Sequence, residues 1–298
     1  MPVTRGDRDE SRAFLALLLM TPRHWAAVAE RVEELGSAVE SLRQGTGQMD
    51  LWGSDPGTSE RLEEAGRLLE QWGHEGMGFA SVIDDDYPEQ LLTIHQRPPF
   101  VMWRGTRMAD DARGVAVVGT RKPSAKGVDR ARRLARDLAE RGVTVISGLA
   151  AGIDTAVHLG ALEGGGRTVS VIGTGLRRNY PRENADLQAR IAEHGLVLSQ
   201  FLPDAPPSQQ SFPMRNAVMS GYAAATVVIE AAWKSGARMQ ARLALEHGRT
   251  VFLLSSLLEH DWAREYAERP GAHVVETVDD VLEHLDTALP AEGELTWA

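Results

Sequence analysis

The feature that most constrains this chain is a regular alternation of short apolar runs with longer amphipathic stretches after residue 113. The runs at 114–119, 143–147 and 225–231 are rich in Val and Ile and lack polar alternation, which is typical of parallel strands covered on both faces. Stretches with helical periodicity follow these runs. This alternation predicts an α/β fold: an extended Rossmann-like, doubly wound and mostly parallel sheet.

The remaining predicted elements extend the same pattern in both directions along the chain. Further strands are predicted at 79–83, 100–105, 167–173, 196–200, 250–254 and 273–275. Helices are predicted at 84–94, 125–142, 154–165, 182–195, 214–223, 237–248 and 277–285. Together they place one Rossmann domain over residues 79–288, followed by a disordered tail over residues 289–298.

The segment before residue 79 has a different pattern, because its apolar positions recur only at helical spacing. Amphipathic stretches predict helices at 11–20, 22–35 and 59–73. Thr21 and Pro22 predict the start of the second helix as N-cap and first-turn proline, and Gly36 predicts its end. With a Gly-rich loop at 43–59, they form a small helical, SAM-like domain over residues 1–78.

Composition excludes several classes of protein. The chain has no cysteine, so disulfides and thiolate zinc sites are excluded. Its apolar runs are shorter than the roughly 20 residues that a membrane span needs, and we expect a cytoplasmic protein. The net charge of −10 argues mildly against a polyanionic partner, although a local basic groove can still bind one.

The basic residues do cluster, in three groups. The largest group follows the apolar run at 114–119, and the other two follow later predicted strands. Ordinary solvated helix faces also produce such clusters. This pattern alone therefore fits either a basic groove that binds a polyanion or a solvated helix face. The three groups are Arg121, Lys122, Lys126, Arg130, Arg132, Arg133 and Arg136; Arg177, Arg178 and Arg182; and Arg238 and Arg242.

The loops after five predicted strands are rich in Gly, Ser and Arg. Ligands of an open parallel sheet bind beyond the carboxyl ends of its strands. Glycines let backbone N–H groups approach phosphate oxygens, and helix N-termini add partial positive charge. The five loops therefore predict a phosphate-binding edge. They are 119–121, 147–154, 173–181, 200–216 and 230–237.

Four further residues on these segments are candidates for chemistry. Glu230 ends an apolar strand and is the best candidate general base, although no His or second carboxylate is paired with it in sequence. Asp154 is predicted to cap the helix that follows it, and His158 to pack inside that helix. Phe212 lies on a polar, Pro-rich loop, where it could stack on a base or fix the loop to the sheet.

Taken together, these loops resemble the DNA-processing protein A (DprA, also called Smf) family of bacteria. The order and spacing of the motifs agree from about Phe79 to Leu254. Each motif alone is weak, and the combination is specific. The motifs are "DDDYPEQLLTIHQRPPFVMWRG", "VVGTRKPSAKG", "VISGLAAGIDTAVHLGAL", "VIGTGLRRNYPREN", "FPMRN" and "VVIEAAWKSGA".

The resemblance implies a non-enzymatic, homodimeric Rossmann protein that binds single-stranded DNA without sequence specificity. It also implies loading of a RecA-type recombinase in natural transformation, with no cofactor or metal. Arg121 would hold a phosphate, Phe212 would stack on a base, and Arg215 with Asn216 would hold the backbone beside it. The implied contact residues are Gly119, Thr120, Arg121, Lys122, Ser124, Ser147, Gly148, Gly175, Phe212, Arg215, Asn216, Ser235 and Gly236.

Several positions depart from the family pattern and keep alternatives open. Ala217 stands where the family usually has a second arginine, Ala237 replaces a serine, and Gln209 stands where a basic residue is sometimes found. We also expect no C-terminal winged-helix domain. A nucleotide sensor or nucleotide-cleaving enzyme using the same edge is the alternative, as is an interaction scaffold built on the N-terminal helices.

Overall fold

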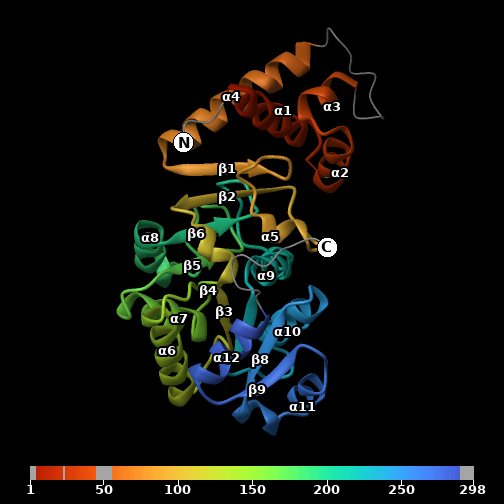
Figure 1. The fold of residues 1–298 in the computed structure, drawn as a ribbon. Helices are drawn as coiled ribbons and strands as arrows, with labels where there is room; N and C mark the ends of the chain where they lie inside the picture. The colour runs from red at the N-terminus through yellow and green to blue at the C-terminus, as the bar shows by residue number, and fades with distance from the viewer. Residues whose placement is uncertain (1–4, 23, 45–55, 289–298) are drawn as a thin grey trace. The chain divides into compact units, whose positions relative to one another are not determined.

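The computed structural model describes residues 5–22, 24–44 and 56–288 (Figure 1). The predicted tail at 289–298 and most of the predicted loop at 43–59 lie outside these ranges. Contacts divide the chain into two compact units. The first holds the described residues of 1–92 together with 98–104, and the second holds 93–97 and the described residues from 105 onward.

The first unit combines helices with a two-stranded antiparallel ribbon. In the ribbon, Phe79 pairs with Met102 and Ser81 with Phe100. The stacked rings of Phe79 and Phe100, 5.4 Å apart, help to hold it against the helices, since Trp25 of α2 lies edge-on to Phe100. The elements are α1 (Arg5–Met20), α2 (Trp25–Leu35), α3 (Ala38–Gln44), α4 (Pro56–His74), β1 (Met77–Ser81), α5 (Glu89–Leu92) and β2 (Phe100–Gly105).

Two predictions for these helices are wrong in detail. Helix α2 begins at Trp25 with His24 at the N-cap position, because the Thr21 hydroxyl donates to the Leu17 carbonyl at 2.7 Å and so prolongs the end of α1. Helix α3 was not predicted, since it is too short to show helical periodicity. Gly36 does end α2, in the left-handed conformation with φ 68°.

The second unit is built on a parallel sheet, which confirms the predicted Rossmann-like, mostly parallel architecture. In the described residues its strand order is β6-β5-β4-β3-β7-β8-β9, and every recorded pairing between these strands is parallel. The strands are β3 (Val115–Val118), β4 (Val145–Ser147), β5 (Thr168–Val171), β6 (Leu196–Ser199), β7 (Ala225–Val228), β8 (Thr250–Leu254) and β9 (Ala272–Val275).

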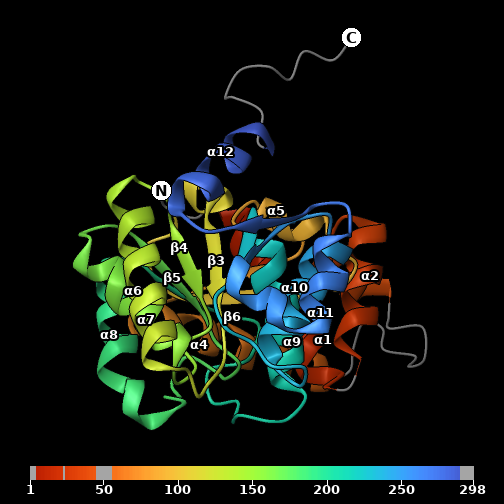
Figure 2. The ribbon, with the colours of Figure 1, turned by 90° about the horizontal axis from the view of Figure 1, so that it is seen from below.

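Helices cover both faces of this sheet (Figure 2). Helices α6 and α7 pack on one face, and their alanines meet the valines of β3 and β7 in a single apolar core. Helices α9 and α10 lie on the other side. The helices are α6 (Ala125–Glu140), α7 (Ile153–Glu163), α8 (Ala185–His194), α9 (Ser211–Tyr222), α10 (Gly236–Glu246), α11 (Asp261–Ala267) and α12 (Val278–Ala288).

The strand order has a reversal point that decides where a ligand can bind. From β3, the chain adds β4, β5 and β6 on one side and β7, β8 and β9 on the other. The loops after β3 and β7 therefore diverge at the carboxyl edge, where open α/β sheets bind their ligands. In the described ranges, no helix is both long and apolar enough to span a membrane.

Candidate functional site

The turn after β3 is held tightly by its neighbours at the reversal point. The amide of Thr120 donates to the carbonyl of Glu230 at 2.7 Å, and the amide of Ile153 donates to the carbonyl of Thr120 at 3.2 Å. A Cβ on Gly119 would lie 2.5 Å from Cγ1 of Ile153. The glycine is therefore needed here for close packing against α7.

The Glu230 carboxylate occupies the start of α6. It accepts hydrogen bonds from the Ser124 amide at 3.1 Å and from the Ser124 hydroxyl at 2.8 Å. That hydroxyl in turn accepts from the Gly127 amide at 3.0 Å, and a Cβ on Gly127 would lie 2.1 Å from Glu230 Oε2. Ser124 and Gly127 are thus organised around a carboxylate of the protein itself.

This carboxylate changes two predictions. A helix N-terminus readily binds an anion. At α6 this anion is the Glu230 carboxylate. It fills the position and repels a second negative charge, so a phosphate cannot bind there. Glu230 acts as an anchor that joins the loops after β3 and β7, and the prediction that it is a general base finds no paired acid or base in its recorded contacts.

An exposed aromatic and cationic patch lies beside this anchored turn. The Cζ atom of Arg121 lies 5.0 Å from the centre of the Phe212 ring, and the ring of Tyr180 lies 5.5 Å from that of Phe212. Arg121 and Tyr180 are exposed and Phe212 is half-buried. We call Arg121, Tyr180 and Phe212 the rim platform.

Glycine at position 173 allows the Phe212 ring to pack closely against the loop after β5. A Cβ there would come within 2.9 Å of Phe212 Cδ1. The structure therefore brings together Arg121 and Phe212, which were predicted as separate contacts from distant loops. Tyr180 was missed by sequence reasoning, although an aromatic residue in a Gly- and Arg-rich loop after β5 was a usable signal. Lys122 lies exposed next to this patch, with its amide bonded to the Thr120 hydroxyl at 3.2 Å.

Arg215 was predicted to hold the DNA backbone at the surface, but the structure buries its side chain. It is only 5% exposed, its Nη1 lies 3.9 Å from Asp154 Oδ2, and the same atom donates to the Val171 carbonyl at 3.4 Å. A Cβ on Gly148 would overlap this guanidinium, at 1.2 Å from Nη1. The residue therefore forms a buried layer beneath the rim, and Gly148 provides the space for it.

The electrostatics of this buried layer follow from desolvation. Burial raises the pKa of Asp154, opposed by the charge of Arg215, and burial lowers the pKa of Arg215, opposed by Asp154. Burial, with a smaller contribution from Arg215, also lowers the pKa of His158 to about 3. His158 is thus a neutral core residue, as predicted.

Asp154 is not the N-cap that its position suggested. Gly152 is the N-cap of α7, and the Asp154 carboxylate accepts from the Ala150 amide at 3.3 Å within the buried layer. A glycine is required at position 152 because its φ is +88°. The carboxylate is therefore the counter-charge of Arg215, and its distance from solvent leaves it no direct contact with a ligand.

Three other predicted contact residues are used inside the fold. Ser147 is fully buried and donates its hydroxyl to the Val117 carbonyl at 2.7 Å. The Gly175 amide donates to the Ala205 carbonyl at 3.0 Å, and its Cα packs against the backbone of residues 202–203 in the loop after β6. Asn216 is buried and donates to the carbonyl of Gly236 at 3.3 Å. None of these three groups faces the rim platform.

Ser235 and Gly236 lie at the start of α10. Ser235 is its N-cap and accepts from the Ala237 amide at 3.2 Å, and Gly236 is exposed with open space around its Cα. Three of the five cations of α6 are paired with carboxylates: Arg132 with Glu163, Arg133 with Asp129 and Arg136 with Glu140. The long basic run is therefore largely a solvated, salt-bridged helix face.

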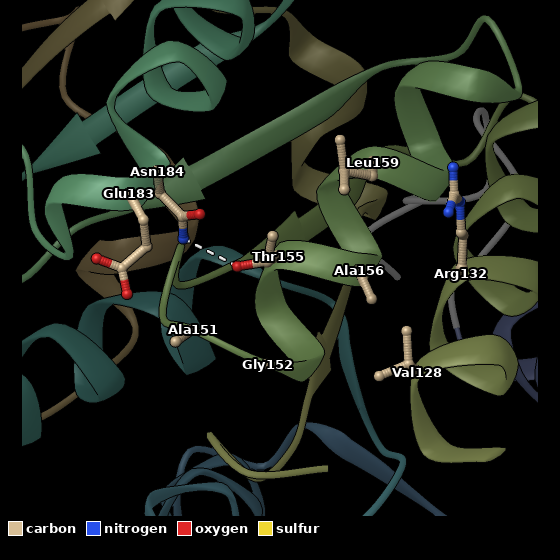
Figure 3. A pocket seen from close by; sticks show the side chains of 9 residues that line it. All are labelled: Val128, Arg132, Ala151, Gly152, Thr155, Ala156, Leu159, Glu183 and Asn184. Atoms are coloured by element: carbon tan, nitrogen blue, oxygen red, sulfur yellow. Dashed lines mark hydrogen bonds between the residues drawn. The ribbon is translucent and has the colours of Figure 1, made fainter. Parts of the chain in front are cut away.

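A shallow pocket of about 300 Å³ lies between α6 and α7 (Figure 3). Val128 from α6 and Ala156 and Leu159 from α7 give it a mainly apolar lining. At one end, the Asn184 amide donates to the Thr155 hydroxyl at 2.9 Å. This pocket was not predicted, and its lining offers little to an anion.

Comparison with known proteins places these features in a family context. A family model described as DNA recombination-mediator protein A matches residues 78–286. DNA processing protein DprA of Bacillus subtilis (strain 168) is 32% identical over 222 residues, which cover 74% of this chain and 75% of that protein. The residues matched by the family model, 78–286, include every residue of the rim platform and of the buried layer.

Two solved structures share the fold. The X-ray structure of DprA from Streptococcus pneumoniae has a TM-score of 0.72 at 30% identity and covers 95% of this chain and 98% of that one. The structure of DNA processing protein A from Helicobacter pylori, described for its single-stranded DNA binding mode, has a TM-score of 0.61 at 27% identity. It covers 70% of this chain and 95% of that one.

Proposed function

Because this chain belongs to the DNA recombination-mediator protein A family, we propose that it binds single-stranded DNA on the rim platform. The family acts in DNA processing and recombination, and the Helicobacter pylori relative is described as a single-stranded DNA binder. The observation that carries the proposal is the pair of exposed Arg121 and half-buried Phe212 at the carboxyl edge, with the guanidinium carbon 5.0 Å from the ring centre.

The chemistry of the rim platform suits a strand of any sequence. Every base has a π-face, so stacking on Phe212 or Tyr180 does not discriminate among bases. Arg121 can bond a phosphate oxygen while it stays over the ring, which combines charge-assisted hydrogen bonding with cation–π attraction.

Membership of the family supports three further properties. We include in the proposal the loading of a RecA-type recombinase onto the bound strand, a homodimeric state and a cytoplasmic location. The role is non-enzymatic, which fits the engagement of Glu230 by Ser124. A mononucleotide ligand is disfavoured because Glu230 fills the helix N-terminus that would hold its phosphate.

Binding of a fluorescent oligo-dT, followed by anisotropy over a salt series, tests this function. Arg121→Ala should weaken binding about ten-fold and flatten the salt dependence, since one phosphate contact is lost. Phe212→Ala should weaken it about ten-fold at every salt concentration, and Phe212→Trp should retain it. Arg190→Ala, which removes an exposed cation of α8, is the matched control and should bind normally.

Two outcomes would overturn DNA binding itself, and a third would overturn its place on the rim platform. The first is a folded wild-type protein that does not bind oligo-dT at low salt. The second is a melting point raised by mononucleotides but unchanged by oligo-dT, which would establish the nucleotide-binding alternative. Equal affinity of wild type, Arg121→Ala and Phe212→Ala would retain DNA binding but move it away from the rim platform.

A further inference from the structure

A second exposed aromatic residue lies on the loop between β7 and α10. Trp233 is 55% exposed, the largest exposed fraction among the big apolar residues in the described ranges. The Cζ atom of Arg238 lies 3.7 Å from the centre of its ring, and Arg238 Nη1 donates to the Trp233 carbonyl at 3.2 Å. This contact fixes the arginine and the indole as one unit, in which the indole remains largely solvated.

The unit borders an open pocket of about 370 Å³. Tyr266 of α11, which is buried, lies beneath it with its ring 5.7 Å from the Arg238 guanidinium. Ser235 and Gly236 at the start of α10 form one wall. An exposed indole and a cation in one open hollow, supported from below by Tyr266, can recognise a planar base attached to a phosphate.

The charge of this pocket is positive. Lys234 and Arg238 have no ion pair with a carboxylate in the part of the chain that the structure describes, and no acidic residue lines the hollow. Arg242, also in the lining, is paired with Glu246 at 2.6 Å and adds little. In a chain with a net charge of −10, an exposed hollow with two unneutralised cations favours an anionic ligand.

The pocket lies on the same edge of the sheet as the rim platform. Strands β3 and β7 are adjacent and parallel, and Trp233 follows β7 three residues after Glu230, which is bonded to Ser124 in the turn after β3. The pairing of an arginine with an aromatic ring, half-buried in Phe212 and exposed in Trp233, thus occurs twice along one edge. A ligand that carries several bases and phosphates matches such a repeat, and a single nucleotide does not.

We propose that Trp233, Arg238 and Lys234 form a second base-stacking and phosphate-binding site for the strand bound at the rim platform. Trp233 stacks a base, while Arg238 and Lys234 bond the flanking phosphates. This deepens the proposed function and rests on it. From the sequence, Arg238 was assigned only to a basic cluster and Trp233 was assigned no role. The signal that identified Phe212, an aromatic residue on a loop at the carboxyl edge, applies equally to Trp233.

The test combines affinity with tryptophan fluorescence, using an oligo-dT of about 20 nucleotides. Trp233→Ala should weaken binding about ten-fold, and Trp233→Phe should largely retain affinity. Bound bases quench a stacked indole, so the wild type should lose fluorescence on titration, and Trp233→Phe should show a smaller loss. Met108→Ala removes another exposed apolar side chain and should match the wild type in both measurements.

Wild-type affinity in Trp233→Ala would overturn the inference, as would an unchanged fluorescence loss in Trp233→Phe. If either occurs while Phe212→Ala still weakens binding, only this second site fails and the proposed function stands. Absence of binding by the wild type would reject the proposed function itself. Circular dichroism of each variant shows that an effect arises in a folded protein, and Arg238→Gln, expected to weaken binding to a similar extent, provides an independent variant.

Discussion

Replacement of Arg215 by methionine tests the buried layer under the rim. The substitution keeps an unbranched apolar stem of similar reach and removes the guanidinium. Asp154 then loses its ion-pair partner at 3.9 Å. It keeps the hydrogen bond from the Ala150 amide and the weaker, more distant charge of Arg121. Removing one partner of a buried pair costs about 3–5 kcal/mol, because the other charge stays in the interior.

Protonation of Asp154 limits this cost. The carboxyl can escape its uncompensated charge by binding a proton, at about 1.4 kcal/mol for each pH unit between its ordinary pKa of 3.8 and the pH of the assay. The ceiling is therefore about 4 kcal/mol near pH 7 and about 1.6 kcal/mol near pH 5. We expect Arg215→Met to lose about 3 kcal/mol of unfolding free energy at the higher pH and about half of that at the lower.

The direction of this pH dependence follows from the raised pKa of Asp154. A carboxyl whose pKa is higher in the folded than in the unfolded chain stabilises the fold most at low pH, and this contribution is lost as the pH rises through the folded-state value. Removing Arg215 takes away the charge that lowers this pKa most, so the loss of stability extends to higher pH. Urea unfolding followed by far-UV circular dichroism measures the difference from wild type.

The double variant Asp154→Asn with Arg215→Met serves as the control. It removes both charges, so its stability should return to within about 1 kcal/mol of wild type at both pH values. A loss below about 1 kcal/mol in Arg215→Met near pH 7, or a loss that does not change with pH, would refute the buried pair.

Two further predictions concern stability. Glu230→Ala removes the acceptor for both Ser124 donors and should lower the unfolding free energy by about 1–2 kcal/mol in urea, while Glu230→Gln, which keeps one acceptor oxygen, should lose less. His158 has a pKa of about 3, far below its ordinary value of 6.5. As the pH falls from about 7 to about 5, this residue is protonated only in the unfolded chain, so the unfolding free energy of the wild type should fall by about 2 kcal/mol. His158→Gln should flatten this part of the pH profile; an unchanged profile would contradict it.

The prediction for His158 has a structural basis beyond burial. The Thr168 hydroxyl donates to the Val145 carbonyl at 2.8 Å, so it can only accept from Nδ1 of His158, also at 2.8 Å. Nδ1 therefore carries the proton of the neutral ring. Nε2 is buried without a hydrogen-bond partner, and a proton added there would have no acceptor. The low pKa is thus a property of the packing around both ring nitrogens.

The sheet could be predicted from the sequence because its signals are local. The Val- and Ile-rich runs and the glycines that follow them report strands and turns within a few residues. The same signals predicted a ligand site at the carboxyl edge, and the loops there contain Arg121 and Phe212. The start of α2 was missed because Thr21 and Pro22 fit a common cap pattern, and only the hydrogen bond of Thr21 to Leu17 shows that α1 uses the residue.

The fine structure of the site could not be predicted because its decisive contacts are distant in sequence. Glu230 and Ser124 are 106 residues apart, and no local pattern shows that a carboxylate fills the start of α6. Arg215 and Phe212 lie one turn apart at the start of α9. Nothing in that spacing decides which of the two is buried, whereas the bare Cα of Gly148 does. The pairing of Trp233 with Arg238 could have been predicted, because the two residues are close in sequence, on the loop after β7 and at the start of α10.

Photo-crosslinking tests the central claim most directly, that the strand lies along this edge of the sheet. An oligo-dT that carries 5-iodouracil forms bonds preferentially with aromatic side chains stacked on it. We expect crosslinks at Phe212 or Tyr180, and at Trp233 when the strand is long enough to reach both positions. Crosslinks confined to residues away from the carboxyl edge would show that the strand binds elsewhere.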